Sequence, residues 1–164
     1  MNFLDILLIL SILLCSLVTG FIFTYAIVVM PGLSKLKDKE FIRAFQVTDE
    51  IIQNNQPIFM LIWVGSIISV LSLIISSVII IGISESLLTI IIGTIYLFGV
   101  QGVTIGIHLL LNNQIQKVNT EELDDQKLHE ERLNFERKWN FFNNIRTIIA
   151  FFITLMFIVI LKNN

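Results

Sequence analysis

Four stretches of apolar residues, each long enough to cross a lipid bilayer, constrain the fold of this chain more than any other feature. They cover about residues 3–30, 57–83, 87–111 and 144–161, and a helix needs roughly 20 residues to cross the hydrocarbon core. Charged residues make up only 15% of the chain, whereas a soluble domain carries about 25%. The sequence therefore predicts one all-α integral membrane domain, residues 1–164, built as an antiparallel bundle of four transmembrane helices.

The first apolar stretch is expected to stay in place as a membrane helix rather than to act as a cleaved signal peptide. Met1 and Asn2 supply no basic segment before it, and it is much longer than the roughly 7–15 apolar residues of a signal peptide. Cys15 is the only cysteine, so no disulfide can form within the chain. The net charge of -2 and the lack of a basic patch argue against nucleic acid as a partner.

The polar connection between Pro31 and Pro57 predicts an amphipathic helix over about residues 39–55. Asp38 is suited to cap this helix, and the run of amides at residues 54–56 is expected to end it. One face carries Phe41, Phe45, Thr48 and Ile52, and the other carries Arg43, Asp49, Glu50 and Gln53. This pattern is typical of a helix that lies at the membrane surface or folds under a bundle.

The second polar connection predicts a helix over about residues 120–143 that continues without a break into the last apolar stretch. Thr120 is a candidate N-cap, four acidic residues follow it, and no proline interrupts the remaining chain. Ion pairs with i,i+4 spacing are expected between Lys127 and Glu131 and between Arg132 and Glu136. His129 lies in this charged segment, and the sequence suggests no functional role for it.

The distribution of basic residues predicts the orientation of the bundle. Of the 11 Lys and Arg residues, nearly all lie in or next to the two polar connections, and only Lys162 lies on the other side. Because cytoplasmic loops are enriched in Lys and Arg, both connections are predicted to be cytoplasmic and both termini outside. We expect the membrane to be a bacterial cytoplasmic membrane.

Polar side chains follow a regular order on the third and fourth apolar stretches. Gln101, Thr104, His108 and Asn112 stand at i, i+3, i+7 and i+11, and Trp139, Asn143 and Arg146 stand at i, i+4 and i+7. In an antiparallel bundle these two faces meet at the membrane end that also holds Met30 and Asn54. Because ionisable groups at membrane depth are costly and tend to serve a site, this end is the predicted functional site.

Each of these residues also fits a structural role, and both interpretations are open at the level of sequence. His108 is suited to a hydrogen bond between helices, Arg146 to reaching lipid headgroups, and Trp139 to the membrane interface. No metal site is predicted, because the apolar helices carry no HxxxH or CxxC motif and one buried histidine does not form a typical site.

Four segments, taken in order, carry a family resemblance. They are Met30–Leu33 (MPGL), Asn54–Phe59, Val103-Thr104 followed by His108–Asn113, and Trp139–Thr147 (WNFFNNIRT). With them the chain resembles the anthrone-oxygenase-like family of small four-helix membrane proteins. The chain departs from the family pattern where it has His108 in place of an Asn and Leu110 in place of a Pro.

The resemblance implies an enzyme that oxidises anthrones, which are fused aromatic polyketides, to anthraquinones with molecular oxygen and no established cofactor. Such a reaction needs a base for the acidic ring CH₂, a donor to the ketone or enolate oxygen and an aromatic slot. His108 is the implied base, Arg146 with Asn112 the implied donors, and Trp139 a wall of the slot. The other expected substrate-binding residues are Asn143, Thr104, Gln101, Asn54 and Met30.

A second class of function fits the same residues. The alternative to the enzyme is a non-enzymatic membrane protein that binds a lipid, a quinone or another small hydrophobic compound. The chain is also compatible with a structural subunit of a membrane assembly, including a homo-oligomer, because small residues such as Ser16, Gly20 and Thr24 form a face for close helix packing. Turnover with oxygen separates the enzyme from these alternatives.

Overall fold

The computed structural model describes residues 2–163, which form helices and contain no strands. The elements are α1 (Phe3–Thr24), the π-helix η1 (Tyr25–Val29), α2 (Met30–Leu33), α3 (Asp38–Gln53), α4 (Pro57–Tyr96), the π-helices η2 (Leu97–Gly102) and η3 (Thr104–His108), α5 (Leu109–Gln116) and α6 (Asp125–Asn163). Three continuous helical segments in this range are long and apolar enough to cross a membrane: Phe3–Leu33, Pro57–Gln116 and Asp125–Asn163. The predicted all-helical architecture with apolar spans is confirmed.

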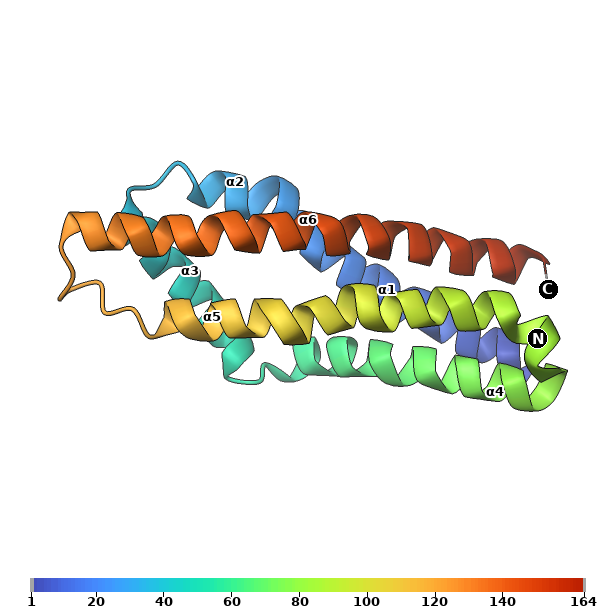
Figure 1. Cartoon of the computed structure of the whole chain (residues 1–164). Coiled ribbons are helices and arrows are strands. Elements are labelled where there is room, and N and C mark those ends of the chain that lie inside the picture. The colour runs from blue at the N-terminus through green and yellow to red at the C-terminus, as the bar shows by residue number, and fades with distance from the viewer. Residues whose placement is uncertain (1, 164) are drawn as a thin grey trace.

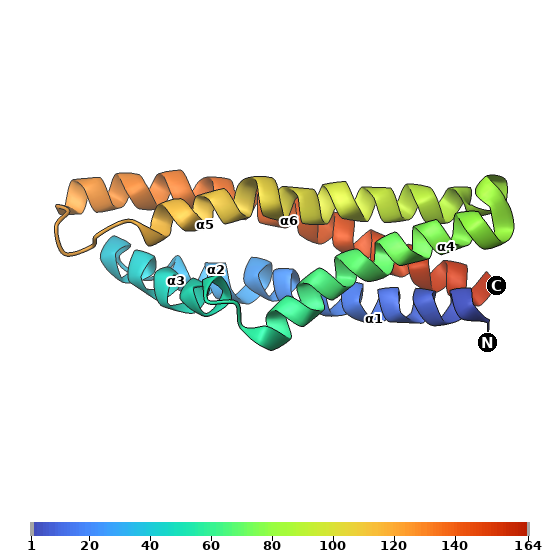
Figure 2. The ribbon, with the colours of Figure 1, turned by 90° about the horizontal axis from the view of Figure 1, so that it is seen from below.

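The longest of these segments reverses its direction at Gly82. This residue has φ 84° and ψ 166°, a conformation that is essentially restricted to glycine, and the Ser86 hydroxyl donates to its carbonyl at 2.6 Å. We call residues 57–81 the outgoing arm and residues 83–116 the returning arm. The two arms run in opposite directions and diverge away from the turn (Figures 1 and 2).

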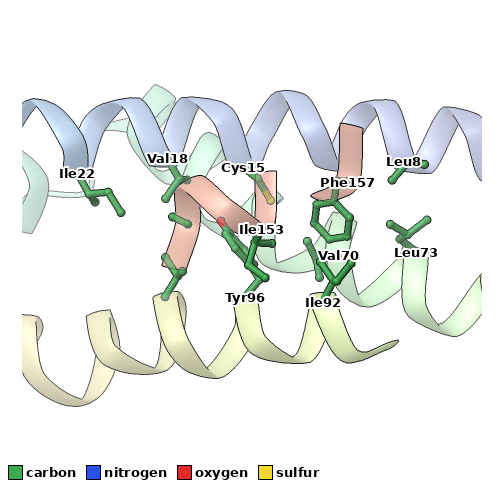
Figure 3. Close-up of a cluster of buried hydrophobic side chains, with 12 residues drawn as sticks. Leu8, Cys15, Val18, Ile22, Val70, Leu73, Ile92, Tyr96, Ile153 and Phe157 are labelled. Carbon is green, nitrogen blue, oxygen red and sulfur yellow. The ribbon is translucent and has the colours of Figure 1, made fainter. Parts of the chain in front are cut away.

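The start of α1 and the end of α6 lie at the same end of the molecule as the Gly82 turn, and α2 and α3 lie at the opposite end (Figure 1). At the turn end, a buried cluster joins α1, both arms and α6 (Figure 3). Its labelled members are Leu8, Cys15, Val18, Ile22, Val70, Leu73, Ile92, Tyr96, Ile153 and Phe157. Gly93 lets the arms approach each other, because a Cβ there would lie 2.6 Å from Ile74 Cδ1.

A second buried cluster lies at the opposite end and joins α2, α3, α5 and α6. Its members are Met30, Phe41, Ile42, Phe45, Ile115, Leu128, Phe135 and Trp139. The rings of Phe45 and Phe135 meet edge to face with their centres 4.6 Å apart. Polar contacts add to this packing, since Gln46 Nε2 donates to the carbonyl oxygens of Ile115 and Val118 at 2.8 and 2.9 Å. The amphipathic helix α3 is thus fixed under the bundle.

The start of α3 differs from the prediction, because Asp38 does not cap the helix. Lys37 takes the cap position, and its backbone N–H donates to the Glu40 carboxylate at 3.3 Å. Asp38 instead accepts a hydrogen bond from Arg132 Nη1 at 2.9 Å, and its other oxygen lies 3.0 Å from His129 Nδ1. Partial burial raises the pKa of Asp38, but the hydrogen bonds to His129 and Arg132 outweigh this effect and lower the pKa below its usual value.

Helix boundaries also differ from the sequence interpretation in three places. The first helix continues past Pro31 to Leu33, and the π-helix η1 lies one turn before the proline, where its ring and missing donor disturb α-helical bonding. The returning arm extends to Gln116. Helix α6 begins at Asp125 rather than near Thr120, because the Asp124 carboxylate accepts from the Lys127 backbone N–H at 2.8 Å and takes the capping role.

The two ion pairs expected on α6 have different outcomes. Arg132 Nε lies 2.8 Å from Glu136 Oε2, as the i,i+4 spacing predicts. The Lys127 ammonium lies 3.8 Å from Asp124 rather than pairing with Glu131. The reason is the position of the helix start, because Asp124 is the residue that precedes α6 and lies one turn away from Lys127.

Candidate functional site

A cavity of about 380 Å³ lies where the two buried clusters meet. Its walls come from α1, η1, α3, both arms and α6. The apolar lining comprises Leu17, Val18, Phe21, Ile22, Phe45, Ile52, Phe59, Met60, Ile62 and Leu109, and the lining with polar atoms comprises Tyr25, Asp49, Gln53, Asn55, Trp63, Thr104, His108, Asn112, Trp139 and Arg146. A mostly apolar cavity with a few converging polar groups is typical of a site for a small hydrophobic molecule.

His108 contributes an imidazole with no polar partner to this cavity. The residue is 2% exposed, and neither ring nitrogen has a hydrogen-bond partner in residues 2–163. Its ring meets the Trp139 ring edge to face, with the centres 5.0 Å apart and an angle of 82° between the planes. Because buried polar groups are nearly always hydrogen-bonded, an imidazole without a partner at the cavity wall is unusual and marks His108 as a candidate functional group.

Arg146 is buried on α6 and has no acidic partner among the described residues. Its Nε donates to Asn143 Oδ1 at 3.0 Å, and its Nη1 donates to the Thr104 hydroxyl at 2.8 Å. Its Cζ lies 5.7 Å from the centre of the Trp139 ring, within the range of a cation–π contact. These contacts hold the guanidinium at the cavity wall while leaving it able to donate further to an oxygen atom.

A chain of three side chains connects α6, α5 and α3 at the cavity. Trp139 Nε1 donates to Asn112 Oδ1 at 3.0 Å, and Asn112 Nδ2 donates to Asp49 Oδ1 at 2.6 Å. The indole can only donate, so it fixes the orientation of the Asn112 amide and directs the NH₂ group to the carboxylate. Asn112 and Trp139 therefore act together rather than as independent contacts.

The returning arm is π-helical where it meets the cavity. Thr104 and His108 lie in η3, and Gln101 lies in η2. A π-turn holds more residues than an α-turn. Residues that would share one face of a regular α-helix therefore do not all share one face here, and Gln101 is not on the face that carries Thr104 and His108. Gln101 lies outside the cavity and donates to Ser66 Oγ and the Tyr96 hydroxyl, both at 2.9 Å.

The structure places five of the nine sequence-predicted site residues at the cavity and four elsewhere. The five are Thr104, His108, Asn112, Trp139 and Arg146. Gln101 donates hydrogen bonds to Ser66 and Tyr96. Asn143 accepts a hydrogen bond from Arg146 and donates one to the Ile22 carbonyl. Met30 is packed in the second cluster, and Asn54 is exposed just after α3. Asn143 supports the site from behind, and Met30 packs in the cluster that contains the cavity residues Phe45 and Trp139. Gln101 and Asn54 do not line the cavity.

Sequence reasoning missed Asp49, which it assigned to the polar face of the amphipathic helix. Asp49 is 2% exposed and lines the cavity. A signal for this burial exists in the sequence, because Ile42, Phe45 and Asp49 have i, i+3, i+7 spacing and share a face of the helix. Ile42 and Phe45 are both buried, so this face, extended by one turn, carries the carboxylate into the cavity.

Within residues 2–163, no three His, Cys, Asp or Glu side chains are grouped closely enough to hold a metal ion. The chemical groups at the cavity are an imidazole, a guanidinium, a carboxylate, amides and aromatic rings. Together they can accept a proton, donate hydrogen bonds to an oxygen atom and enclose a flat apolar molecule. The arrangement therefore suits proton abstraction next to a carbonyl group.

The fold and the cavity define a class, namely an all-helical protein with apolar helices long enough to cross a membrane and with a mostly apolar internal cavity. A family model described as anthrone oxygenase matches residues 52–156, which is more than half of the chain. The chain therefore belongs to the anthrone oxygenase family. No curated protein and no solved structure gives a significant match. The matched region includes both arms and the cavity residues of α5 and α6, and it begins three residues after Asp49.

Proposed function

We propose that this protein is an oxygenase that uses molecular oxygen to oxidise a flat, hydrophobic aromatic ketone of the anthrone type, with no added cofactor. The observation that carries the proposal is the pairing of two groups in one apolar cavity. Among residues 2–163, the His108 imidazole has no hydrogen-bond partner and the Arg146 guanidinium has no acidic partner. Membership of the anthrone oxygenase family supports the same chemistry.

The first step is removal of a proton from the ring CH₂ by a nitrogen of His108. The C–H electron pair stays on the substrate as an enolate, and the Arg146 guanidinium donates hydrogen bonds to its oxygen. Trp139 forms the aromatic wall against which the substrate ring lies. The electron-rich carbon then reduces O₂ and forms a C–O bond, and the proton held by His108 moves to the outer oxygen to give a hydroperoxide.

The hydroperoxide then loses water. The remaining hydrogen of the same carbon leaves as a proton, its electron pair forms the C=O bond, and the O–O bond breaks to release hydroxide, which takes up the proton. The sum is one anthrone and one O₂ converted to one anthraquinone and one water. All atoms and electrons balance without a further reductant.

Purified protein with His108→Ala tests the role of the base. We expect its oxygen uptake with an anthrone to fall by about 10²–10⁴-fold, the usual contribution of a general base. The matched control is His129→Ala, which removes the other histidine from an exposed position that does not line the cavity and should leave oxygen uptake close to that of the wild type. Oxygen uptake by His108→Ala equal to that of the wild type would contradict the assignment. Saturable anthrone binding without any turnover in the wild type would favour the non-enzymatic binder.

We also propose that the chain crosses the membrane four times, with the outgoing and returning arms crossing separately. The reversal at Gly82 supports this count, since it divides the 60-residue segment into two oppositely directed arms. The excess of Lys and Arg at the opposite end of the molecule supports an orientation in which α3 and the segment before α6 are cytoplasmic. Both ends of the chain would then be outside a bacterial cytoplasmic membrane.

A further inference from the structure

Asp49 is a buried carboxylate that has three amide partners and no basic one. Its Oδ1 accepts from Asn112 at 2.6 Å, and its Oδ2 accepts from Gln53 and Gln116, each at 3.1 Å. No Lys, Arg or His side chain of the described residues forms an ion pair with it. Burying a carboxylate without a cation is costly, so packing alone does not account for an acid at this position.

The carboxylate lies between the cavity and a separate polar groove. Asp49 and Gln53 both line the cavity. Gln53 and Gln116, the two residues that bond Oδ2, also line a groove whose other members include Asn113 and Lys117. Asp49 and its two glutamine partners are thus the polar part of the boundary between the apolar cavity and this groove.

One acceptor position of the carboxylate is still free. Two carboxylate oxygens offer about four acceptor positions, and Gln53, Asn112 and Gln116 occupy three of them. The amides come from α3 and α5, so they fix the carboxylate from two elements. The free position is available to a proton that comes from a molecule in the cavity.

We propose that Asp49 is a second acid–base residue of the site, which acts when the hydroperoxide loses water. This rests on the proposed oxygenase function. Asp49 takes the remaining hydrogen of the reacting carbon as a proton, and the C–H electron pair forms the C=O bond while the O–O bond breaks. The protonated carboxyl then gives the proton to the departing hydroxide. The product is water, and it leaves through the polar boundary into the groove.

The division of roles between His108 and Asp49 follows from their surroundings. Three hydrogen bonds from α3 and α5 hold the Asp49 carboxylate in one place at the edge of the cavity. Elimination across a weak O–O bond needs only a weak base, because bond cleavage and carbonyl formation drive the step. The first deprotonation is assigned to His108, whose imidazole has no hydrogen-bond partner among residues 2–163.

Simultaneous measurement of oxygen uptake and anthraquinone formation by Asp49→Asn tests the proposal. We expect oxygen uptake within about threefold of the wild type, because the first deprotonation is intact. Anthraquinone formation should fall at least tenfold, and the hydroperoxide should accumulate and be detected by mass spectrometry as substrate plus two oxygen atoms. A residue with a purely structural role would lower both rates together. The matched control is Glu131→Gln, which removes a carboxylate from an exposed position on α6 and should leave both rates unchanged.

Two results would overturn the proposal while leaving the proposed function in place. One is an Asp49→Asn protein that forms anthraquinone at the wild-type rate. The other is a folded Asp49→Asn protein that loses oxygen uptake in parallel with anthraquinone, as His108→Ala is expected to do. A wild-type protein that neither takes up oxygen nor forms anthraquinone would instead overturn the proposed function, and the role of Asp49 with it.

A second variant keeps the proposal testable if Asp49→Asn does not fold. Asp49→Glu retains the carboxylate and moves it by one methylene group, so it should form anthraquinone and hydroperoxide in a ratio within tenfold of the wild type. Accumulation of hydroperoxide by Asp49→Glu to the level of the uncatalysed reaction would show that the carboxylate at this position does not serve the elimination.

Discussion

Asp38 joins the start of α3 to α6 through two basic side chains. Arg132 donates from Nη1 to Asp38 and to the Leu36 carbonyl, and from Nη2 to the Ser34 carbonyl at 2.8 Å. The same guanidinium lies 4.5 Å above the centre of the Phe41 ring. Because α3 forms part of the cavity wall, this contact contributes to the position of the site.

The lowered pKa of Asp38 predicts a pH-dependent stability. The folded state favours the ionised carboxylate, so its stabilisation is complete above the ordinary pKa of 3.8 and is lost as the pH falls through the lower folded value. We expect Asp38→Asn to lower the free energy of unfolding at pH 7 by about 1 kcal/mol or less. The difference from the wild type should shrink towards zero below pH 3.8. Thermal unfolding in detergent over this pH range measures it.

The control for this effect is Glu131→Gln, which removes an exposed carboxylate next to Arg132, the α6 residue that bonds Asp38. Its difference from the wild type should be small and constant with pH. A stability difference for Asp38→Asn that grows as the pH falls would contradict the direction of the pKa shift.

Asp38 and Asp49 show where residue-level prediction from sequence ends. The helical pattern of α3 predicts the helix itself, but it does not reveal which partners its polar residues have. Asp38 accepts a hydrogen bond from Arg132, which is 94 positions away in sequence, instead of capping α3. Asp49 is buried because Asn112 and Gln116 of α5 donate hydrogen bonds to its carboxylate. Both outcomes depend on contacts between distant segments, which spacing within one helix does not encode.

Among the elements, the turn between the arms depends most on a single residue. A Cβ at Gly82 would meet no other atom, but its φ of 84° and ψ of 166° are strained for any other residue. We therefore expect Gly82→Ala to lower the free energy of unfolding by about 1–3 kcal/mol. Unfolding in detergent with increasing denaturant measures this effect.

Gly20→Ala is the matched control for the turn, since a Cβ there also meets no atom and the residue is in the regular helix α1. Its stability should be unchanged or slightly higher, because alanine favours the helix. Equal stabilities of the two variants would show that the backbone at residue 82 is not strained by a side chain.

The returning arm shows which features of a helix can be predicted from the amino-acid sequence. The order of polar residues predicts that this arm is the functional one, and the structure has Thr104, His108 and Asn112 at the wall of one cavity. The π-helical turns of η2 and η3 have no signal in the spacing, and they separate Gln101 from this group.

At the scale of the whole molecule, the number of membrane crossings gives a direct test of the topology. Cys15 is the only cysteine and is fully buried, so a Cys15→Ala protein is a suitable background. In it, Glu122→Cys and Glu85→Cys place one thiol at each end of the bundle. We expect a membrane-impermeant maleimide to label Glu122→Cys only from the cytoplasmic side and Glu85→Cys only from outside.

Labelling of both thiols from the same side would contradict two separate crossings by the arms. Labelling of Glu122→Cys only from outside would contradict the orientation while leaving the number of crossings intact. Denatured protein should label at both positions, which controls for reactivity.

The overall architecture could be predicted from hydropathy because every backbone polar group in a bilayer must be satisfied within its own helix. Long apolar stretches such as Pro57–Tyr96 and the end of α6 leave little alternative to helices. The cavity could not be predicted in this way. It depends on where α3 packs and on how the arms diverge, and these follow from many weak contacts, such as that of Gln46 with Ile115.

Helix α6 has a mechanical consequence. Its 39 residues form one uninterrupted rod of about 58 Å at 1.5 Å per residue, nearly twice the roughly 30 Å of a bilayer's hydrocarbon core. Trp139 and Arg146 lie near the middle of this rod. A helix that adjusts to a thinner or thicker bilayer does so by tilting, so a tilt of α6 displaces both side chains together relative to α3. We therefore expect the shape of the cavity to respond to the thickness of the bilayer around α6.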